Sequence, residues 1–154
     1  MIYIVCGISG IGKSTYINKI KNDNDIVISR DAIRFSLLKE GEDYFSKEKE
    51  VLKIFFDTIR EETKNYDNDD HNIYIDATHL TKKVRRRVIN NVNTKHKSHI
   101  SCIYFTPDLN KAVNQNNNRT GRAFVPYTSI KTQYDCFETP AKDEGFCEII
   151  EVIN

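Results

Sequence analysis

A glycine-rich segment directly after the first apolar run constrains the fold more than any other part of the sequence. The apolar run, Ile2–Cys6, has β-branched or aromatic side chains at four of its five positions, which is typical of a buried strand. Gly7–Ser14 follows with the spacing G-x-x-x-x-G-K-S, and the periodicity of residues 14–21 predicts a helix. A strand, this loop and a helix together aim backbone N–H groups and a helix N-terminus at a phosphate. A turn of the same shape that holds no ligand is the disfavoured alternative.

Two side chains in this loop have chemistry that suits a nucleotide. Lys13 is placed to reach the β- and γ-phosphates, and the hydroxyl of Ser14 is placed to bind Mg²⁺. We therefore expect ATP or another nucleoside triphosphate as phosphate donor, together with Mg²⁺. The residues expected to surround the phosphates are Gly7, Ser9, Gly10, Ile11, Gly12, Lys13, Ser14 and Thr15.

Beyond this loop, short apolar segments alternate with longer periodic or polar ones, which predicts an α/β domain with a parallel sheet. Strands are expected at residues 2–6, 25–29, 73–76, 99–105 and 146–153. Helices are expected at residues 14–21, 31–38, 47–66, 81–93 and 126–137, with one more opening at 107–108. A length of 154 residues suits one domain. Residues 1–154 are therefore expected to form a single α/β domain.

The charge balance and the cysteines limit the class of protein further. The 23 basic and 22 acidic side chains leave a formal net charge of +1, which excludes a broadly basic nucleic-acid coat but not a local basic groove. No apolar run reaches the roughly 18–20 residues that span a bilayer, and the N-terminus lacks the basic start of a signal peptide. The four cysteines form no C-x-x-C pair. We therefore expect a cytoplasmic protein with reduced thiols and no membrane partner.

Asp31 and Arg34 lie where an expected strand passes into a helix, at the edge where α/β proteins of this class bind ligands. A carboxylate there is placed to accept a proton from an acceptor hydroxyl, as a general base. Arg34 shares a helical face with Asp31, three residues earlier, and is placed to hold an acceptor phosphate beside that base. The same spacing also fits a helix N-cap at Asp31 and a solvated charge at Arg34.

A second carboxylate, Asp76, ends the expected strand at residues 73–76. It is placed to hold Mg²⁺ through water or to fix Ser14, as the carboxylate that follows a buried strand does in nucleotide-binding domains of this kind. The alternative is an aspartate that only caps the strand. Thr78 lies in the loop just beyond, and we group Asp76 and Thr78 with the residues expected to face the acceptor.

A polar segment at about residues 115–126 is expected to form a mobile lid. It contains Arg119 and Arg122, and a mobile arginine that closes over a phosphoryl group stabilises the charge that develops during transfer. A solvated loop is the alternative. Another group of arginines, Arg85–Arg87, is expected to be a solvated helix face rather than a phosphate clamp.

Taken together, these segments resemble the P-loop kinase domain of the bacteriophage polynucleotide 5′-kinase family. The matching segments span nearly the whole chain and are Gly7–Thr15, Ser29–Arg34, Tyr74–Leu80, Arg119–Pro126, Phe137–Pro140 and Glu144–Phe146. The resemblance implies a three-layer P-loop NTPase/kinase fold, with a central parallel sheet flanked by helices and a mobile lid. The chain departs from some relatives in having no room for a phosphatase domain, and in having His79 where asparagine is common.

The resemblance also implies a role for individual residues. Lys13 and Ser14 would bind the ATP phosphates and Mg²⁺. Asp31 would activate the 5′-hydroxyl of the acceptor, and Arg34 would hold the 3′-phosphate of its terminal nucleotide. The catalytic residues expected on this basis are Lys13, Asp31 and the lid arginine on the donor phosphates, Arg119, with Arg122 as the alternative register.

The expected function is ATP-dependent transfer of the γ-phosphate to the 5′-hydroxyl end of DNA or RNA. Two alternatives stay open, namely a kinase of the same fold that acts on a nucleoside or another small molecule, and a nucleotide-binding regulator without transfer activity. The near-neutral charge slightly favours the small-molecule kinase. The pair Asp31 and Arg34 favours a polynucleotide, because an acceptor phosphate needs a cation beside the base.

Overall fold

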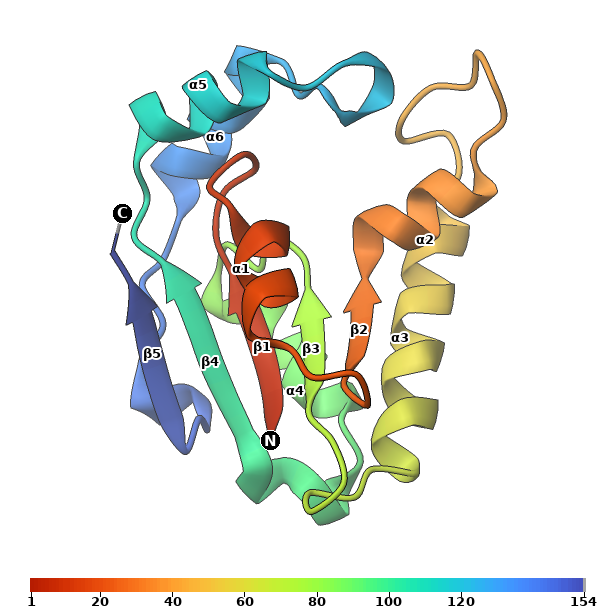
Figure 1. Ribbon diagram of the computed structural model, residues 1–154, viewed down its shortest axis with the longest axis vertical. Coiled ribbons are helices and arrows are strands. Elements are labelled where there is room, and N and C mark those ends of the chain that lie inside the picture. Colours follow the sequence, from red (N-terminus) through yellow and green to blue (C-terminus); the bar gives the residue numbers. More distant parts are fainter. Residues whose placement is uncertain (154) are drawn as a thin grey trace.

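The architecture is a parallel sheet of five strands, seen in a computed structural model that describes residues 1–153 except the side chain of Arg122. The strands are β1 (Ile2–Cys6), β2 (Ile26–Ser29), β3 (Ile73–Asp76), β4 (Ile100–Phe105) and β5 (Glu148–Val152). Their order in the sheet is β2-β3-β1-β4-β5, and every neighbouring pair is parallel (Figure 1). The expected α/β class with a central parallel sheet is confirmed.

Helices connect the strands and cover both faces of the sheet (Figure 1). They are α1 (Lys13–Ile20), α2 (Arg30–Leu37), α3 (Glu48–Lys64), α4 (Lys82–Asn91), α5 (Leu109–Asn117) and α6 (Tyr127–Cys136). Short 3₁₀ helices are η1 (Thr94–His99), η2 (Gly121–Ala123) and η3 (Lys142–Glu144). The expected boundaries differ from these by a few residues. His99 was expected in a strand and instead ends η1. None of the described helices is both long and apolar enough to cross a membrane.

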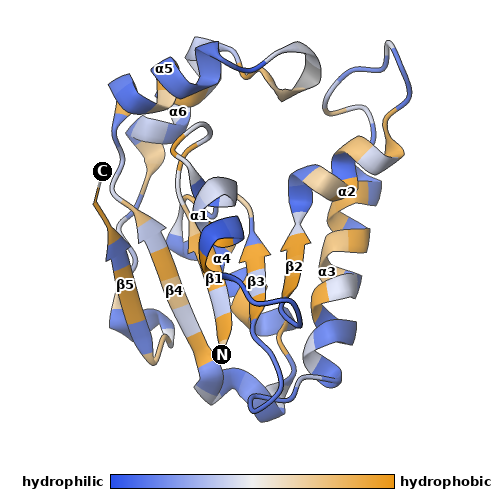
Figure 2. Cartoon of the chain, viewed as in Figure 1, coloured by the Kyte–Doolittle hydropathy of each residue, from blue (hydrophilic) through white to orange (hydrophobic). Residues whose placement is uncertain are grey.

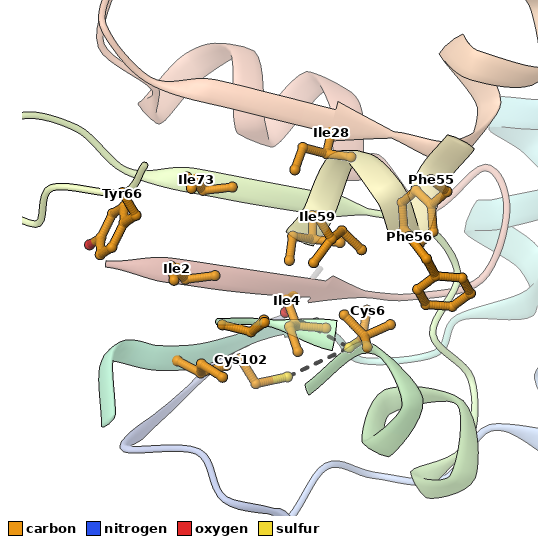
Figure 3. Packing of buried hydrophobic residues seen from close by; sticks show 14 of the residues in the cluster. Ile2, Ile4, Cys6, Ile28, Phe55, Phe56, Ile59, Tyr66, Ile73 and Cys102 are labelled. Carbon is orange, nitrogen blue, oxygen red and sulfur yellow. Dashed lines mark hydrogen bonds between the residues drawn. The ribbon is translucent and has the colours of Figure 1, made fainter. Parts of the chain in front are cut away.

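The core is divided by the sheet into two layers, because successive side chains of a strand point to opposite faces. On one face Ile2, Ile4 and Cys6 of β1 pack with aromatic and aliphatic residues of α3 and α4 (Figure 3). On the other face Val5 packs with residues of α1, α5 and α6. Figure 2 shows the apolar residues concentrated on the strands and on the helix faces turned toward them. The result is the three-layer arrangement of helix, sheet and helix.

The register of the sheet brings the functional segments to one edge. Asp76, the last residue of β3, pairs with Val5 of β1 on one side and with Ser29 of β2 on the other. The backbone N–H of Gly7 then donates to the carbonyl of Thr78 at 3.0 Å. Since the carboxyl ends of these strands coincide, the segments that follow each of them start from the same place, where α/β proteins bind their ligands.

Arg85 of α4 is fully buried, so the expectation of a solvated face at Arg85–Arg87 is wrong for this residue. Its guanidinium donates to both carboxylate oxygens of Glu144 in η3, at 2.7 Å each, and to the carbonyl of His79 at 3.0 Å. Arg86 and Arg87 are exposed, with Arg87 over the ring of Phe56. A buried charge is tolerated only when paired, and Glu144 lies too far along the chain for helical spacing to reveal the pair.

His79 fixes the loop that follows β3. Its ring is buried, its Nδ1 lies 2.7 Å from the carbonyl oxygen of Val5, and its backbone has a left-handed φ of 45°. Burial lowers the pKa of His79 to about 4, so the ring is neutral at pH 7 and its Nδ1–H is the donor to Val5. The Nε2 atom is buried without a hydrogen-bond partner among the described residues.

Removing the carboxylate that faces Arg85 tests the buried ion pair. Glu144→Gln leaves the guanidinium charge buried and unpaired, so we expect the free energy of unfolding to fall by about 3–5 kcal/mol. Urea unfolding at pH 7 measures it, with Glu40→Gln on an exposed loop as the control. A loss no larger than that of the control would mean that the pair contributes nothing to stability.

His79→Asn tests the acid sensitivity of the fold. The folded pKa near 4 lies below the ordinary value of 6.5, so the unfolded chain binds the proton first as the pH falls. His79 therefore destabilises the folded protein increasingly below pH 6.5, by about 2 kcal/mol at pH 5. Asparagine tolerates the left-handed backbone and does not titrate. Urea unfolding at pH 7 and pH 5 should show a smaller acid-induced loss in the variant; an equal loss in both proteins would exclude His79 as its source.

Candidate functional site

A cavity of about 630 Å³ opens at the carboxyl edge of the sheet. It is lined by residues of the P-loop (Gly7–Ser14), the start of α2, the end of β3, the segment between α2 and α3, α5, the lid and α6. The sequence-predicted residues that line it are Ser9, Gly10, Gly12, Lys13, Ser14, Thr15, Asp31, Arg34, Asp76, Thr78 and Arg119. Gly7 and Ile11 lie in the same loop but do not line the cavity, and Ile11 is buried in the core.

The P-loop depends on glycine at two positions. Gly10 and Gly12 have φ angles of 82° and 107°, values that side-chain-bearing residues rarely adopt. A Cβ atom on Gly10 would also lie 2.5 Å from the carbonyl oxygen of Ala112 in α5. Gly12 is the N-cap of α1 and makes no side-chain hydrogen bond to the helix, so it satisfies none of the N–H groups of the first turn. They form a natural anion site.

The side chain of Lys13 folds back onto the backbone at the start of the P-loop. Its ammonium donates to the carbonyls of Gly7 and Ile8, at 2.9 and 3.0 Å. Burial lowers the pKa of Lys13, and the charges of Asp76 and Asp31 partly oppose this effect. The Lys13 side chain therefore lines the cavity while its ammonium is held by two backbone carbonyls of the P-loop.

Ser14 and Asp76 are in contact on the cavity wall. A contact with Ser14 is one of the two roles that the sequence indicated for Asp76. The hydroxyl of Ser14 donates to Oδ2 of Asp76 at 3.3 Å. Burial raises the pKa of Asp76, while Lys13 and the Ser14 hydrogen bond lower it. Two oxygen groups of this kind suit a hard divalent cation.

The N-cap alternative for Asp31 is wrong, because Ser29 caps α2. The hydroxyl of Ser29 accepts from the backbone N–H of Ala32 at 3.2 Å. Asp31 is the second residue of α2, within its first turn, and 60% of its side chain is exposed on the cavity wall. Its carboxylate pairs with Arg34 and accepts a hydrogen bond from the hydroxyl of Tyr44 at 2.7 Å. The carboxylate is thus oriented from two sides while it remains accessible.

The solvated alternative for Arg34 is also wrong, since only 4% of its side chain is exposed. Its Nε and Nη2 atoms donate to the carboxylate of Glu48 at 2.9 to 3.1 Å. Its Nη1 atom pairs with Asp31 and lies 2.7 Å from the hydroxyl oxygen of Tyr44. Arg30 also pairs with Glu48. The guanidinium is fixed on the Glu48 side, and its opposite edge faces the cavity.

Sequence reasoning missed Tyr44 and Glu48. Tyr44 lines the cavity, and burial together with the nearby Asp31 raises its pKa. Glu48 begins α3, 14 residues beyond Arg34. No helical or strand spacing relates these positions, so the only available signal is the fold, which packs the start of α3 against α2.

The side chain of Asn116 connects the two ends of the lid segment. It is buried, although the sequence predicted a mobile segment at this position. Its side chain donates to the carbonyl of Val125 at 2.6 Å and accepts from the Val125 N–H at 2.9 Å. Residues 117–124 therefore lie between two positions that are hydrogen-bonded to each other, Asn116 and Val125. Within it, Arg119 lines the cavity and its Nη1 lies 3.5 Å from the carbonyl oxygen of Ala123. The side chain of Arg122 lies outside the described residues.

The fold is shared with several proteins of known structure, among them a kinase. A gluconokinase from Sinorhizobium meliloti 1021 matches with a TM-score of 0.62 and 17% identity, over 98% of this chain and 81% of that one. Kti12 from Chaetomium thermophilum, in complex with ADP-AlF3, matches with a TM-score of 0.66 and 10% identity, over 99% and 89%. At these identities the likeness establishes the fold alone.

A further structural match is a chain of the Pnkp1/Rnl/Hen1 RNA repair complex, with a TM-score of 0.67 and 22% identity. It covers 87% of this chain but only 43% of the matched one. No curated protein sequence matches this chain. The sequence model of a family described as AAA domain matches residues 2–140. The chain therefore belongs to this AAA domain family and has a P-loop kinase fold.

Proposed function

We propose that this protein transfers the γ-phosphate of ATP to the 5′-hydroxyl end of DNA or RNA. The observation that carries the proposal is the accessible carboxylate of Asp31, which is held beside the buried guanidinium of Arg34 on the wall of the P-loop cavity. A base and a cation in contact suit an acceptor that presents a hydroxyl close to a phosphate. The motifs shared with polynucleotide 5′-kinases and the fold of the RNA repair chain support the same choice.

The donor site uses the P-loop. The N–H groups at the start of α1 and the ammonium of Lys13 would hold the phosphates of ATP. Ser14 and Asp76 offer the oxygen atoms that Mg²⁺ prefers, with Asp76 acting directly or through water. The bound ion would offset charge on the β- and γ-phosphates.

The acceptor site uses Asp31 and Arg34 in turn. A 3′-phosphate on the terminal nucleotide would take the Nη1 side of Arg34, which now pairs with Asp31 and Tyr44. This exchange frees the Asp31 carboxylate to accept the proton of the 5′-hydroxyl. The hydroxyl oxygen then bonds to the γ-phosphorus, the bond to the bridging oxygen breaks, and ADP leaves. Thr78, which lines the cavity beyond Asp76, belongs to the same acceptor wall.

Exposed aromatic side chains near this site favour a nucleotide acceptor. Phe45 is 67% exposed and Phe124 is 46% exposed, and both line the cavity. They come from the segment between α2 and α3 and from the lid, which face each other in Figure 1. Exposed rings cost hydration free energy unless a ligand covers them, and nucleobases stack on such faces.

A small-molecule kinase is the second candidate, favoured by the charge around Arg34. Glu48 and Asp31 already offset its positive charge, so an uncharged acceptor such as a sugar would not need to displace a carboxylate. The two candidates differ in whether an acceptor phosphate adds binding energy.

Lys13→Met tests the donor site. The ammonium supplies positive charge where the γ-phosphoryl group accumulates negative charge, so we expect phosphate transfer to fall by about 10²-fold or more. Thermal unfolding controls for loss of the contacts to Gly7 and Ile8. A folded variant that transfers phosphate at a near wild-type rate would remove the P-loop from the mechanism.

Arg119→Ala tests the lid. If the arginine acts on charge that develops during transfer, kcat should fall more than the affinity for ATP. The matched variant is Arg122→Ala, assayed under the same conditions. Full activity in Arg119→Ala together with a loss in Arg122→Ala would assign the role to Arg122 instead.

Asp31→Asn and Arg34→Ala test the acceptor site separately. Asparagine keeps the size and polarity of Asp31 but not its basicity, so transfer should fall about 10²-fold or more with near-normal ATP binding. Arg34→Ala should weaken an acceptor that carries a 3′-phosphate, since such a pair contributes on the order of 1.5–3 kcal/mol.

The measurement is kcat/KM for a nucleoside 3′-monophosphate and for the bare nucleoside, in wild type and in Arg34→Ala. Wild type should prefer the phosphorylated acceptor, and the variant should lose this preference. Equal values for both acceptors in wild type would reject the polynucleotide kinase in favour of the small-molecule kinase.

A further inference from the structure

Gln133 makes a direct hydrogen bond to the P-loop. Its Oε1 atom accepts from the backbone N–H of Ser9 at 2.7 Å, across 124 positions of sequence. Gln133 belongs to α6, and it lines the cavity together with Ser129 of the same helix and the N-cap residue Pro126. These three positions are spaced three and four residues apart, as one helix face requires. No motif in the sequence indicates this residue.

The contact with Ser9 fixes which way the carboxamide faces. A backbone N–H only donates, so the atom opposite it must be the amide oxygen and not the amide nitrogen. The NH₂ group of Gln133 therefore occupies the other branch of the planar amide. The hydrogen bonds among the described residues include none that this NH₂ group donates. Gln133 lines the cavity beside the P-loop, so its NH₂ group is placed to donate to an acceptor oxygen of a bound ligand.

The two segments that make this contact, α6 and the P-loop, both pack against buried parts of the protein. Ile130, one turn before Gln133, is fully buried against the sheet. The other side of the P-loop packs on α5, where the space beside Gly10 is filled by the backbone of Ala112. The loop thus lies between α5 and α6, and the backbone of α6 beside Gln133 is anchored by the buried Ile130.

We propose that Gln133 is a phosphate ligand of the donor site, with its NH₂ group donating to an oxygen of the β- or γ-phosphate of a nucleoside triphosphate. The inference rests on the proposed donor site but not on the identity of the acceptor. A neutral amide adds a hydrogen bond to the bound triphosphate without adding charge. Because α6 follows the lid directly, this ligand would also connect occupancy of the donor site to the base of the lid.

Two substitutions separate phosphate binding from support of the loop. Gln133→Met has a similar length but neither accepts from Ser9 nor donates. Gln133→Glu still accepts from Ser9, yet it has no NH₂ group and places a negative charge beside the phosphates. Thr132→Val, at the exposed neighbouring position of α6, controls for changes in the helix itself.

The experiment is calorimetric titration of each protein with ATP, ADP and AMP in the presence of Mg²⁺, without an acceptor. We expect Gln133→Met to weaken ATP binding about tenfold, and Gln133→Glu to weaken it more than that. AMP binding and Thr132→Val should match wild type, and the result with ADP should tell the β-phosphate from the γ-phosphate.

Several results would overturn the proposal. Wild-type ATP affinity in Gln133→Glu would mean that the residue only supports Ser9, and wild-type affinity in Gln133→Met would mean that it contributes nothing. Equal weakening of ATP and AMP would indicate a general disturbance of the loop. None of these readouts requires phosphate transfer, so a failure to phosphorylate polynucleotides would leave the test of Gln133 intact.

Discussion

The parallel pairing of β3 with both β1 and β2 determines where this protein can do chemistry. Asp76 lies opposite Val5 and Ser29 in the register of the sheet, so the three strands end together. From that edge the chain enters the P-loop, the start of α2 and the loop that contains Thr78 and His79. A shift of one residue in the register would move Asp76 to the other face and away from Ser14. The geometry of the site is therefore a consequence of strand pairing.

Two buried arginines show how charge is used on either side of this edge. Arg85 is enclosed by Glu144 and a backbone carbonyl, and both its charge and its hydrogen bonds are satisfied within the fold. Arg34 is fixed by Glu48 in a similar way, but its other edge meets Asp31 and Tyr44 at the cavity wall. The first arginine stabilises the loops behind the site. The second is held by Glu48, and its other edge is occupied by two side chains that line the cavity.

The sequence was informative wherever the signal is local. The spacing of Gly7–Ser14 and the apolar periodicities predicted the strands, most helix positions and the loop that faces the cavity. Local spacing could not decide between two structures that are compatible with the same residue spacing. The three-residue spacing of Asp31 and Arg34 fits a solvated arginine as well as a buried one, and only the packing of α3 against α2, which places Glu48 opposite Arg34, decides between them.

Contacts between distant segments had no local signal at all. Glu48, Glu144 and Gln133 are ordinary polar residues in the sequence, and each becomes specific because the fold places it opposite a particular arginine or backbone N–H. Asn116 lies in a run of polar residues that suggested mobility, yet its side chain connects the two ends of the lid segment. Such roles depend on tertiary packing, which helix or strand periodicity does not encode.

In the function that we propose, the cavity brings the γ-phosphate of ATP to the 5′-hydroxyl of a polynucleotide. The most direct measurement incubates the protein and Mg²⁺ with γ-labelled ATP and equal concentrations of a 5′-hydroxyl oligonucleotide and gluconate, and then quantifies the label in each acceptor. A polynucleotide 5′-kinase should label the oligonucleotide, and should leave it unlabelled when its 5′ end is already phosphorylated. Label on gluconate, with the oligonucleotide unlabelled, would contradict the proposed function.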